Sequence, residues 1–421
     1  MTSSNSAAKV TNLTINGQRL WASLMELARI GATEKGGVCR LTLTDLDKKA
    51  RDLFAGWCKA AGASISVDRM GNVFARREGR DPARAPVMTG SHIDTQPTGG
   101  KFDGAYGVMA GLEVLRTLNE TGIETEAPIE VAVWTNEEGA RFAPAMMGSG
   151  VFAGIFKEDE IKAKTDREGV AFGDALAKIG YAGERPCGGR KVAAFFECHI
   201  EQGPILEAER KTIGVVTGGQ AQRWYEVNLT GQESHAGTTP MERRRDALLG
   251  AARIVDMVNH IGVTHMPSAR ATCGVIESHP QSRNTVPGRV FLTAEFRHPD
   301  EAELSIMDKT FRAQAARIAD EIGLALDVKE IWHFPATPFH ADCIAAVRDA
   351  AQSRGLPHRD IISGAGHDAL YMARVAPTAM IFVPCADGIS HNEIESAEAD
   401  DLAAGCQVLL DAMIRRANAP A

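Results

Sequence analysis

The sequence lacks paired cysteines. Its eight cysteines are scattered along 421 residues, and no two of them form a C-x-x-C pair. We therefore expect neither a disulfide framework nor a zinc ribbon. Cys198 directly precedes His199, but an isolated cysteine is more often a small buried hydrophobic residue than a ligand or a nucleophile.

Long apolar runs and an excess of positive charge are also missing. No apolar run approaches the ~20 residues that span a bilayer, and the first residues are polar, without the apolar segment of a secretory signal. The formal net charge of -8 disfavours nucleic acid or an anionic membrane as the main partner. We expect a cytoplasmic protein that binds neither.

The remaining composition, 44% hydrophobic and 24% charged, is ordinary for a globular enzyme. A chain of 421 residues is long enough for two domains, or for one domain with a large insertion. Strand patterns at 86–92, 128–135, 193–199 and 376–384 are separated by helical patterns. This alternation predicts an α/β fold with a mainly parallel sheet.

Between residues 218 and 332 the pattern changes to strand, helix, strand, strand, helix, strand. This βαββαβ order predicts a ferredoxin-like unit inserted in the first domain. We therefore predict a catalytic domain of residues 1–217 and 333–421 and an inserted domain of residues 218–332. Within the insert we expect one strand over 271–277 and a last strand over 324–332.

One stretch has the composition of a metal site. Residues 86–107 hold His92, Asp94 and Asp103 among five glycines. Alternation along the predicted strand sends His92 and Asp94 to the same side, where the Asp94 carboxylate can accept the other ring N–H of the histidine. Asp103 stands at a helix entrance, and by itself it would be interpreted as a helix cap.

Other predicted strand ends also carry ligand-type side chains. In an α/β sheet, chemistry gathers at the carboxyl ends of the strands. The set therefore predicts a divalent metal centre. Imidazole and carboxylate ligands suit zinc, with manganese, cobalt or nickel as substitutes. The candidate ligands are His92, Asp103, Glu138, His199 and His391.

Two metal ions fit this set if one aspartate bridges them, and Asp103 is the candidate bridge. Glu137 directly precedes Glu138. Because neighbouring side chains at a strand end diverge, Glu138 can bind a metal while Glu137 faces the water between the ions. Metal binding lowers the pKa of that water to ~7, so Glu137 is the predicted general base.

Eight motifs carry a resemblance to a known family. They are GSHID (90–94), GGKFDG (99–104), TNEEG (135–139), HIEQG (199–203), SHAG (234–237), RNTVP (283–287), GHD (366–368) and SHNE (390–393). In this order they resemble the dinuclear-zinc amidohydrolases related to aminoacylases and bacterial carboxypeptidases. More narrowly, they resemble the N-carbamoyl-amino-acid amidohydrolase and β-ureidopropionase branch. The resemblance implies two metal ions per chain on the candidate ligands, Glu137 as the base, and an insert that is both a lid and the surface of a homodimer.

The same resemblance assigns roles to further residues. It implies that His235 polarises the scissile carbonyl, that Asn284 hydrogen-bonds the substrate, and that Arg297 holds the substrate carboxylate by a two-pronged contact. Gln202 and the backbone near Gly366 would complete the pocket. Without the resemblance, the sequence favours simpler interpretations: His235 as a loop histidine, Asn284 as a turn residue and Arg297 as an exposed strand residue.

Together with the predicted metal centre, the resemblance implies hydrolysis of the ureido C–N bond of an N-carbamoyl L-α- or β-amino acid, which releases the amino acid, ammonia and carbon dioxide. Allantoate or another ureide is the nearest alternative, because a few pocket side chains can redirect specificity. An aminoacylase or peptidase is a weaker alternative. A metal-binding scaffold without catalysis is disfavoured because a purely structural site needs no second carboxylate such as Glu137.

Overall fold

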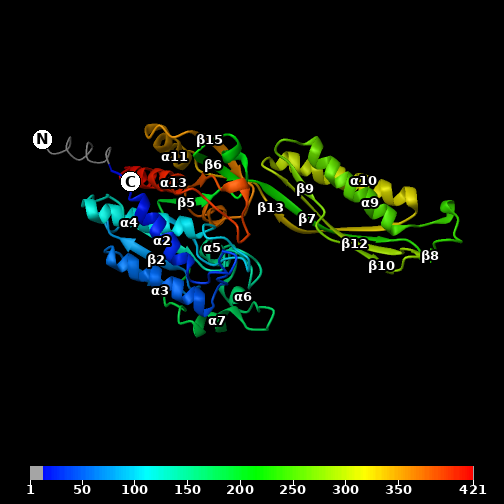
Figure 1. Cartoon of the computed structure of the whole chain (residues 1–421), viewed down its shortest axis with the longest axis horizontal. Helices are drawn as coiled ribbons and strands as arrows, with labels where there is room; N and C mark the ends of the chain where they lie inside the picture. The colour runs from blue at the N-terminus through cyan, green and yellow to red at the C-terminus, as the bar shows by residue number, and fades with distance from the viewer. Residues whose placement is uncertain (1–12, 421) are drawn as a thin grey trace. The chain divides into compact units, whose positions relative to one another are not determined.

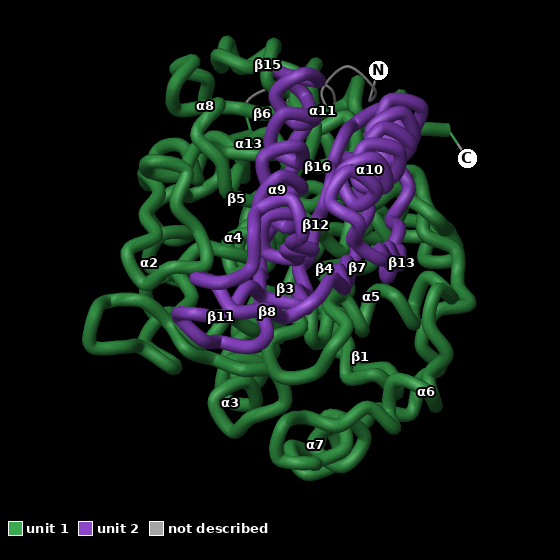
Figure 2. Tube along the Cα trace, turned by 90° about the vertical axis from the view of Figure 1, so that its right-hand side faces the viewer, with its two compact units in different colours: residues 1–218, 339–421 green, residues 219–338 purple. Residues whose placement is uncertain are grey.

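The computed structural model describes residues 13–420 (Figure 1). These residues form two compact units, which Figure 2 shows in different colours. Unit 1 contains the residues up to Gly218 and those from Phe339 on, and unit 2 is Gly219–Pro338. The predicted end of the insert at residue 332 lies inside strand β13 (Ala325–Phe334), because its pairing with β7 (Ala221–Thr230) continues to Phe334.

The sheet of unit 1 has a parallel centre with antiparallel strand pairs on either side of it. Its order is β1-β2-β4-β3-β5-β16-β6, with β15 also paired to β6. β4, β3, β5 and β16 are parallel neighbours, and they form its centre. Strands β1 and β2 are antiparallel because a short turn joins them. The bounds are β1 (Ser64–Val67), β2 (Val73–Arg77), β3 (Val87–His92), β4 (Ile129–Trp134), β5 (Ala194–Ile200), β6 (Ile213–Gly219), β15 (His358–Ser363) and β16 (Thr378–Val383).

Helices cover the parallel centre of the sheet. Helix α4 packs on β3, β4 and β5, while α13 packs on β3, β5 and β16. A Cβ at Gly111 of α4 would lie 2.6 Å from the side chain of Val131, so glycine lets α4 approach the sheet closely. The bounds are α2 (Gly17–Ala28), α3 (Asp45–Ala60), α4 (Ala105–Thr121), α5 (Met147–Phe152), α6 (Glu158–Lys162), α7 (Phe172–Lys178), α8 (Ile205–Ala208), α11 (Ala341–Ser353), α12 (Asp368–Met372) and α13 (Ala399–Ala417), with the short 3₁₀ helix η2 (Ala386–Gly388).

Unit 2 has its own antiparallel sheet and core. The strand order is β10-β12-β7-β13, and helices α9 and α10 both pack on β12 and β7. Its core includes Tyr225, Phe296 and Phe311, whose rings pack with centroids 5.0 to 6.0 Å apart. The remaining bounds are β8 (Ser234–His235), η1 (Met241–Arg243), α9 (Ala247–Thr264), β9 (Arg270–Thr272), β10 (Ile276–His279), β11 (Thr285–Val286), β12 (Arg289–His298), α10 (Glu301–Ile322) and β14 (Thr337–Pro338).

The single strand predicted over 271–277 is two strands, β9 and β10. Thr272 pairs with Glu295, and Ile276 pairs with Leu292. Residues 273–275 therefore face only two residues of β12, and the extra residue makes a bulge that interrupts the strand. Among the residues described, no helix combines the length and apolarity needed to cross a bilayer.

Candidate metal centre

Asp103 lies among three histidines of unit 1. Its Oδ1 is 3.1 Å from Nε2 of His199 and 3.6 Å from Nε2 of His92. Its Oδ2 is 3.3 Å from Nε2 of His391. The two oxygens therefore face different histidines, which is the arrangement that a carboxylate needs to bridge two cations.

The candidate ligand atoms form two groups around these oxygens. The first group is His92, His199 and Asp103, and the second is Glu138, His391 and Asp103, with the ligand atoms of each group within 4.8 Å of one another. Parallel pairing explains the first group, because His92 ends β3 and His199 lies near the end of the adjacent β5. We predicted His391 at a strand end, and this prediction is wrong. His391 follows η2 in the loop after β16, at a φ of 54°.

The histidine rings present Nε2 to Asp103. Nδ1 of His92 lies 2.8 Å from the main-chain oxygen of Asp94, and Nδ1 of His199 lies 2.9 Å from that of Ile200. A ring whose Nδ1–H donates to a carbonyl offers the lone pair of Nε2 to a metal. Consistent with this, Nε2 of His199 accepts a hydrogen bond from the backbone N–H of Gly104, at 3.2 Å.

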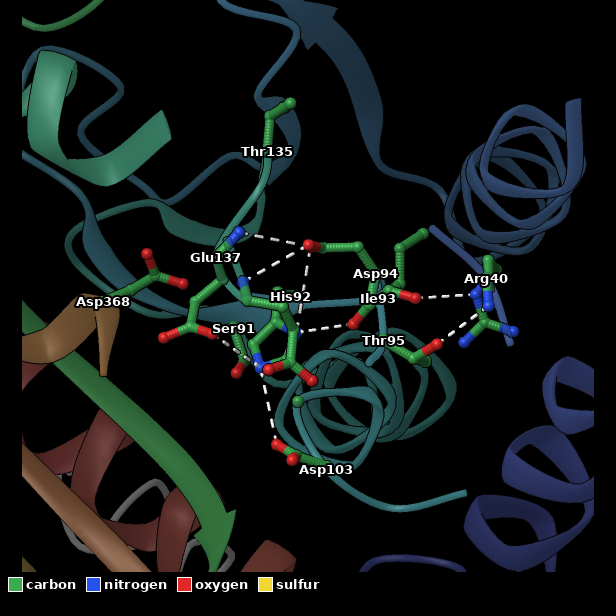
Figure 3. Close-up of polar contacts among 12 residues, drawn as sticks. Arg40, Ser91, His92, Ile93, Asp94, Thr95, Asp103, Thr135, Glu137 and Asp368 are labelled. Atoms are coloured by element: carbon green, nitrogen blue, oxygen red, sulfur yellow. Dashed lines mark hydrogen bonds and ion pairs between the residues drawn. The ribbon is translucent and has the colours of Figure 1, made fainter. Parts of the chain in front are cut away.

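The Asp94 carboxylate does not take the predicted N–H of His92. Its Oδ1 is 3.8 Å from Nδ1 of that ring, which the Asp94 main chain satisfies instead. The two carboxylate oxygens accept from the backbone N–H groups of Glu137 and Glu138, each at 3.3 Å. Figure 3 shows Asp94 between His92 and the backbone of Glu137. Asp94 therefore orients the carboxylate pair, and its main chain orients His92.

Glu137 and Glu138 point to different groups. Oε2 of Glu137 lies 3.4 Å from Nε2 of His92, and Oε2 of Glu138 lies 3.4 Å from Nε2 of His391. Glu138 also accepts a hydrogen bond from the side chain of Gln96, at 2.7 Å. Glu137 is only 8% exposed. The adjacent carboxylates thus have separate neighbours, and Glu137 lies beside the first group without belonging to it.

Burial and neighbouring charge separate the acidities of these carboxyl groups. Burial raises the pKa of Glu137 well above its usual range and that of Glu138 to about 7. Burial also disfavours ionisation of Asp103, but the neighbouring rings of His199, His391 and His92 hold the pKa of Asp103 well below its usual range. The bond with Asp103 raises the pKa of His391 to about 9. Asp103 is therefore the ionised centre of the cluster.

The cluster fits divalent cations. Nitrogen lone pairs and carboxylate oxygens face one another here, and buried charges in proteins are paired or bind metals. Imidazole nitrogens and carboxylate oxygens are the usual ligands of zinc. A further group of possible ligands, Glu197, His199 and His367, shares His199 with the first. Both oxygens of Glu197 already accept hydrogen bonds, from the Ser91 hydroxyl and the Ala369 N–H.

The residues predicted for the substrate lie in both units. In unit 1, Gln202 donates to Oδ2 of Asp103 at 2.9 Å, so its amide contacts a candidate ligand. Gly366 precedes His367, whose ring centroid lies 4.5 Å from that of His199. This places the Gly366 loop next to the first group. His367 belongs to the GHD motif (366–368), but the sequence analysis gave it no role because a single histidine in a loop has no spacing to test.

Unit 2 brings His235 and Asn284 together. Strand β8 pairs with β11, and the Asn284 carbonyl accepts from the N–H of Ala236 at 2.9 Å. Nδ1 of His235 accepts from the N–H groups of Gly237 and Thr238, at 3.0 and 3.2 Å. Because Nδ1 is an acceptor, the neutral ring carries its proton on Nε2.

Arg297 lies near the end of β12. Every second residue of this strand is buried under the helices. Arg297 and Glu295 lie at the positions between them, which are only partly buried. The Arg297 guanidinium contacts both carboxylate oxygens of Glu295, at 3.0 and 3.2 Å. The predicted carboxylate-binding residue therefore already interacts with a carboxylate of its own strand.

Sequence comparison gives the family. The family model described as peptidase family M20/M25/M40 matches residues 88–415. The chain belongs to this family. The matched range contains all five candidate metal ligands and Glu137.

Members of the family resemble this chain over nearly its full length. An N-carbamoyl-L-amino-acid amidohydrolase of Rhizobium meliloti is 49% identical, over 98% of this chain and 99% of the relative. An allantoate amidohydrolase of Bacillus subtilis is 35% identical, over 93% and 95%. A crystal structure of an amidase of the hydantoinase/carbamoylase family from Burkholderia multivorans matches with a TM-score of 0.94 and 61% identity, over 97% of this chain and 100% of that chain.

Proposed function

We propose that this protein is a metal-dependent amidohydrolase that cleaves the ureido C–N bond of N-carbamoyl amino acids. The observation that carries the proposal is the carboxylate of Asp103, whose two oxygens face two separate ligand groups with Glu137 beside them. The name of the Rhizobium meliloti relative supports the substrate class. The products are an amino acid, ammonia and carbon dioxide.

We assign two divalent ions to the two groups, most simply zinc, with manganese, cobalt or nickel as substitutes. His92 and His199 would hold one ion, Glu138 and His391 the other, and Asp103 both. When bound, such ions supply an acidified water and polarise the scissile carbonyl. Adjacent residues then act on the substrate and on the proton.

Glu137 is the general base in this proposal. It accepts a proton from the attacking water and delivers it to the leaving nitrogen. Burial favours its protonated form, so the group can hold that proton between the two steps. The Asp94 carboxylate accepts the backbone N–H of Glu137 and so fixes the position of this residue.

We assign substrate binding to residues of both units. His235 has its proton on Nε2, where it can donate to the scissile carbonyl oxygen. Asn284 hydrogen-bonds the substrate, and Arg297 exchanges its contact with Glu295 for one with the substrate carboxylate. Gln202 and the Gly366 backbone complete the pocket. Unit 2, Gly219–Pro338, is accordingly the proposed lid.

We also propose that the enzyme works in the cytoplasm. We further propose that the chain forms a homodimer through unit 2. Support for the dimer comes from β10, which is an edge strand of the unit 2 sheet and exposes Ile276 by 51%. Unpaired edge strands are ready templates for pairing with another chain. Light scattering on the full chain, with Ile276→Lys as the disrupting variant, tests this interface.

The function is tested by ammonia release from a substrate panel, with protein reconstituted in zinc, manganese, cobalt or nickel. N-carbamoyl-L-amino acids should be hydrolysed faster than allantoate. Allantoate is the second candidate because the Bacillus subtilis relative carries that name. Preference for N-acyl amino acids or peptides over every ureide would overturn the proposal.

Arg297→Lys should weaken binding of an N-carbamoyl amino acid by ~10- to 100-fold, because it loses a forked hydrogen bond to a charged group. Steady-state kinetics should show a raised KM and, if lid closure positions the carbonyl, a lower kcat as well. The matched substrate is the N-carbamoyl amino acid amide, which has no free carboxylate. Wild type should be poor on it and the variant little worse. An equal loss of kcat/KM on both substrates would show that Arg297 supports the fold and does not bind the substrate carboxylate.

A further inference from the structure

One buried carboxylate joins the two loops that carry Asp103 and His391. Glu395 is 3% exposed. Its Oε1 accepts from the backbone N–H groups of Phe102 and Asp103, at 2.9 and 3.1 Å. Its Oε2 accepts from the hydroxyl of Ser390, at 2.8 Å. The Glu395 side chain therefore holds the backbone of Asp103, one candidate ligand. It also holds Ser390, which directly precedes His391, another candidate ligand.

The connection continues to the carboxylate of Asp103. The Ser390 hydroxyl lies 3.2 Å from Oδ2 of Asp103. The Gln202 amide donates both to this Oδ2, at 2.9 Å, and to the Ser390 oxygen, at 3.0 Å. Oδ2 is the oxygen that faces His391. The network thus contacts the second group at Oδ2 and at the loop of His391. Asp103 is shared with the first group, but none of the bonds of Glu395 goes to His92 or His199.

Gly100 leaves room for this carboxylate. A Cβ at Gly100 would collide with both the carboxylate and the Cβ of Glu395. The Gly99-Gly100 bend therefore has a packing role in addition to turning the chain, because it lets the loop of Asp103 close over Glu395.

We infer that Glu395 is a positioning residue. It holds the side chains of Asp103 and His391 at the relative position that the ion of the second group requires. The inference rests on the proposed metal centre. A carboxylate that accepts two backbone N–H groups restricts where the following side chain can point, and Ser390 ties the His391 loop to the same anchor. Loss of such outer contacts typically lowers metal affinity 10- to 100-fold.

Zinc titration of the metal-free full chain tests this role by calorimetry, with visible absorption of the cobalt-loaded protein as a second readout. Wild type should bind two equivalents. Glu395→Ala should bind the first normally and the second at least ~10-fold more weakly, with a changed cobalt spectrum. Glu395→Gln should restore the second equivalent, because its amide oxygen can still accept both N–H groups and its NH₂ can reach Ser390.

Asp68 offers a matched control in unit 1. It is 1% exposed, and its Oδ1 accepts from the N–H groups of Met70 and Asn72, at 2.9 and 3.0 Å. Its Oδ2 accepts from the Asn72 amide, at 2.9 Å. Asp68→Ala therefore removes a similar set of buried bonds away from the loops of Asp103 and His391. It should lower thermal stability and still bind both equivalents of zinc.

Each outcome decides a different point. Wild-type affinity for both equivalents in Glu395→Ala, or an equal loss in Glu395→Ala and Asp68→Ala, would overturn the positioning role alone. Absence of zinc binding in the wild type would overturn the metal centre itself. If Glu395→Ala does not fold, Ser390→Ala takes its place, since it cuts the link between Glu395 and Oδ2 of Asp103. It should weaken the second equivalent selectively, and no change there would overturn the inference.

Discussion

Glu137→Gln is expected to leave both metal ions bound and to lower turnover at least ~10²-fold. Glutamine keeps the shape of the side chain but cannot take a proton from water. Glu137 belongs to neither ligand group and lies 3.4 Å from His92, so metal content should change little. The loss corresponds to about 2.7 kcal/mol of transition-state stabilisation, and it should appear in kcat on N-carbamoyl amino acids.

Glu138→Gln is the matched comparison at the neighbouring position. Oε2 of Glu138 faces His391 within the second group, so this variant should lose metal from that group together with activity. Metal analysis after dialysis separates the two variants. Near-normal turnover of metal-loaded Glu137→Gln would exclude the assigned base, and loss of metal from it would make Glu137 a ligand.

Asp103→Ala is expected to release both ions and to abolish hydrolysis. Its Oδ1 faces His199 and His92 while its Oδ2 faces His391, so one substitution removes a ligand from each group. The loss of zinc affinity should exceed the ~10²-fold typical of an outer-shell contact. Zinc calorimetry and metal analysis measure it directly, independent of activity.

His391→Ala supplies the contrast, since it belongs to the second group only. It should keep one ion where Asp103→Ala keeps none. A chelator should likewise inactivate the wild type, and added zinc should restore the activity. Retention of two ions by Asp103→Ala would disprove the bridge, and full activity of metal-free wild type would disprove the metal mechanism.

The hydrogen bonds around the candidate metal centre were harder to predict from the sequence than its ligands. Arg40 is 1% exposed and donates to the main-chain oxygen of Ile93, which anchors the turn after β3 (Figure 3). It also donates to the main-chain oxygens of Leu27 and Ile30. Glu395 reaches the Asp103 backbone across 292 residues of sequence. Neither residue stands at a periodic position of a motif, and a hydrogen bond over such a separation leaves no local pattern.

Local chemistry determined much of this protein from the sequence alone. Short, largely apolar runs predict β3, β4, β5 and β16, because every residue of these strands is buried and both faces of the sheet centre are covered. Ligand-type residues after these strands indicated a metal centre. Residue type also sets the start of α3, because threonine is a preferred helix cap and the Thr44 hydroxyl accepts the N–H of Asp47.

Only the tertiary structure decided which atoms meet. His92 takes the main-chain oxygen of Asp94 and not its carboxylate, because the backbone turns at the end of β3 and sends that carboxylate to the N–H groups of Glu137 and Glu138. The split between β9 and β10 depends on one extra residue opposite β12. Register, loop path and side-chain direction follow from packing between distant segments, and residue types and spacing along one segment do not encode them.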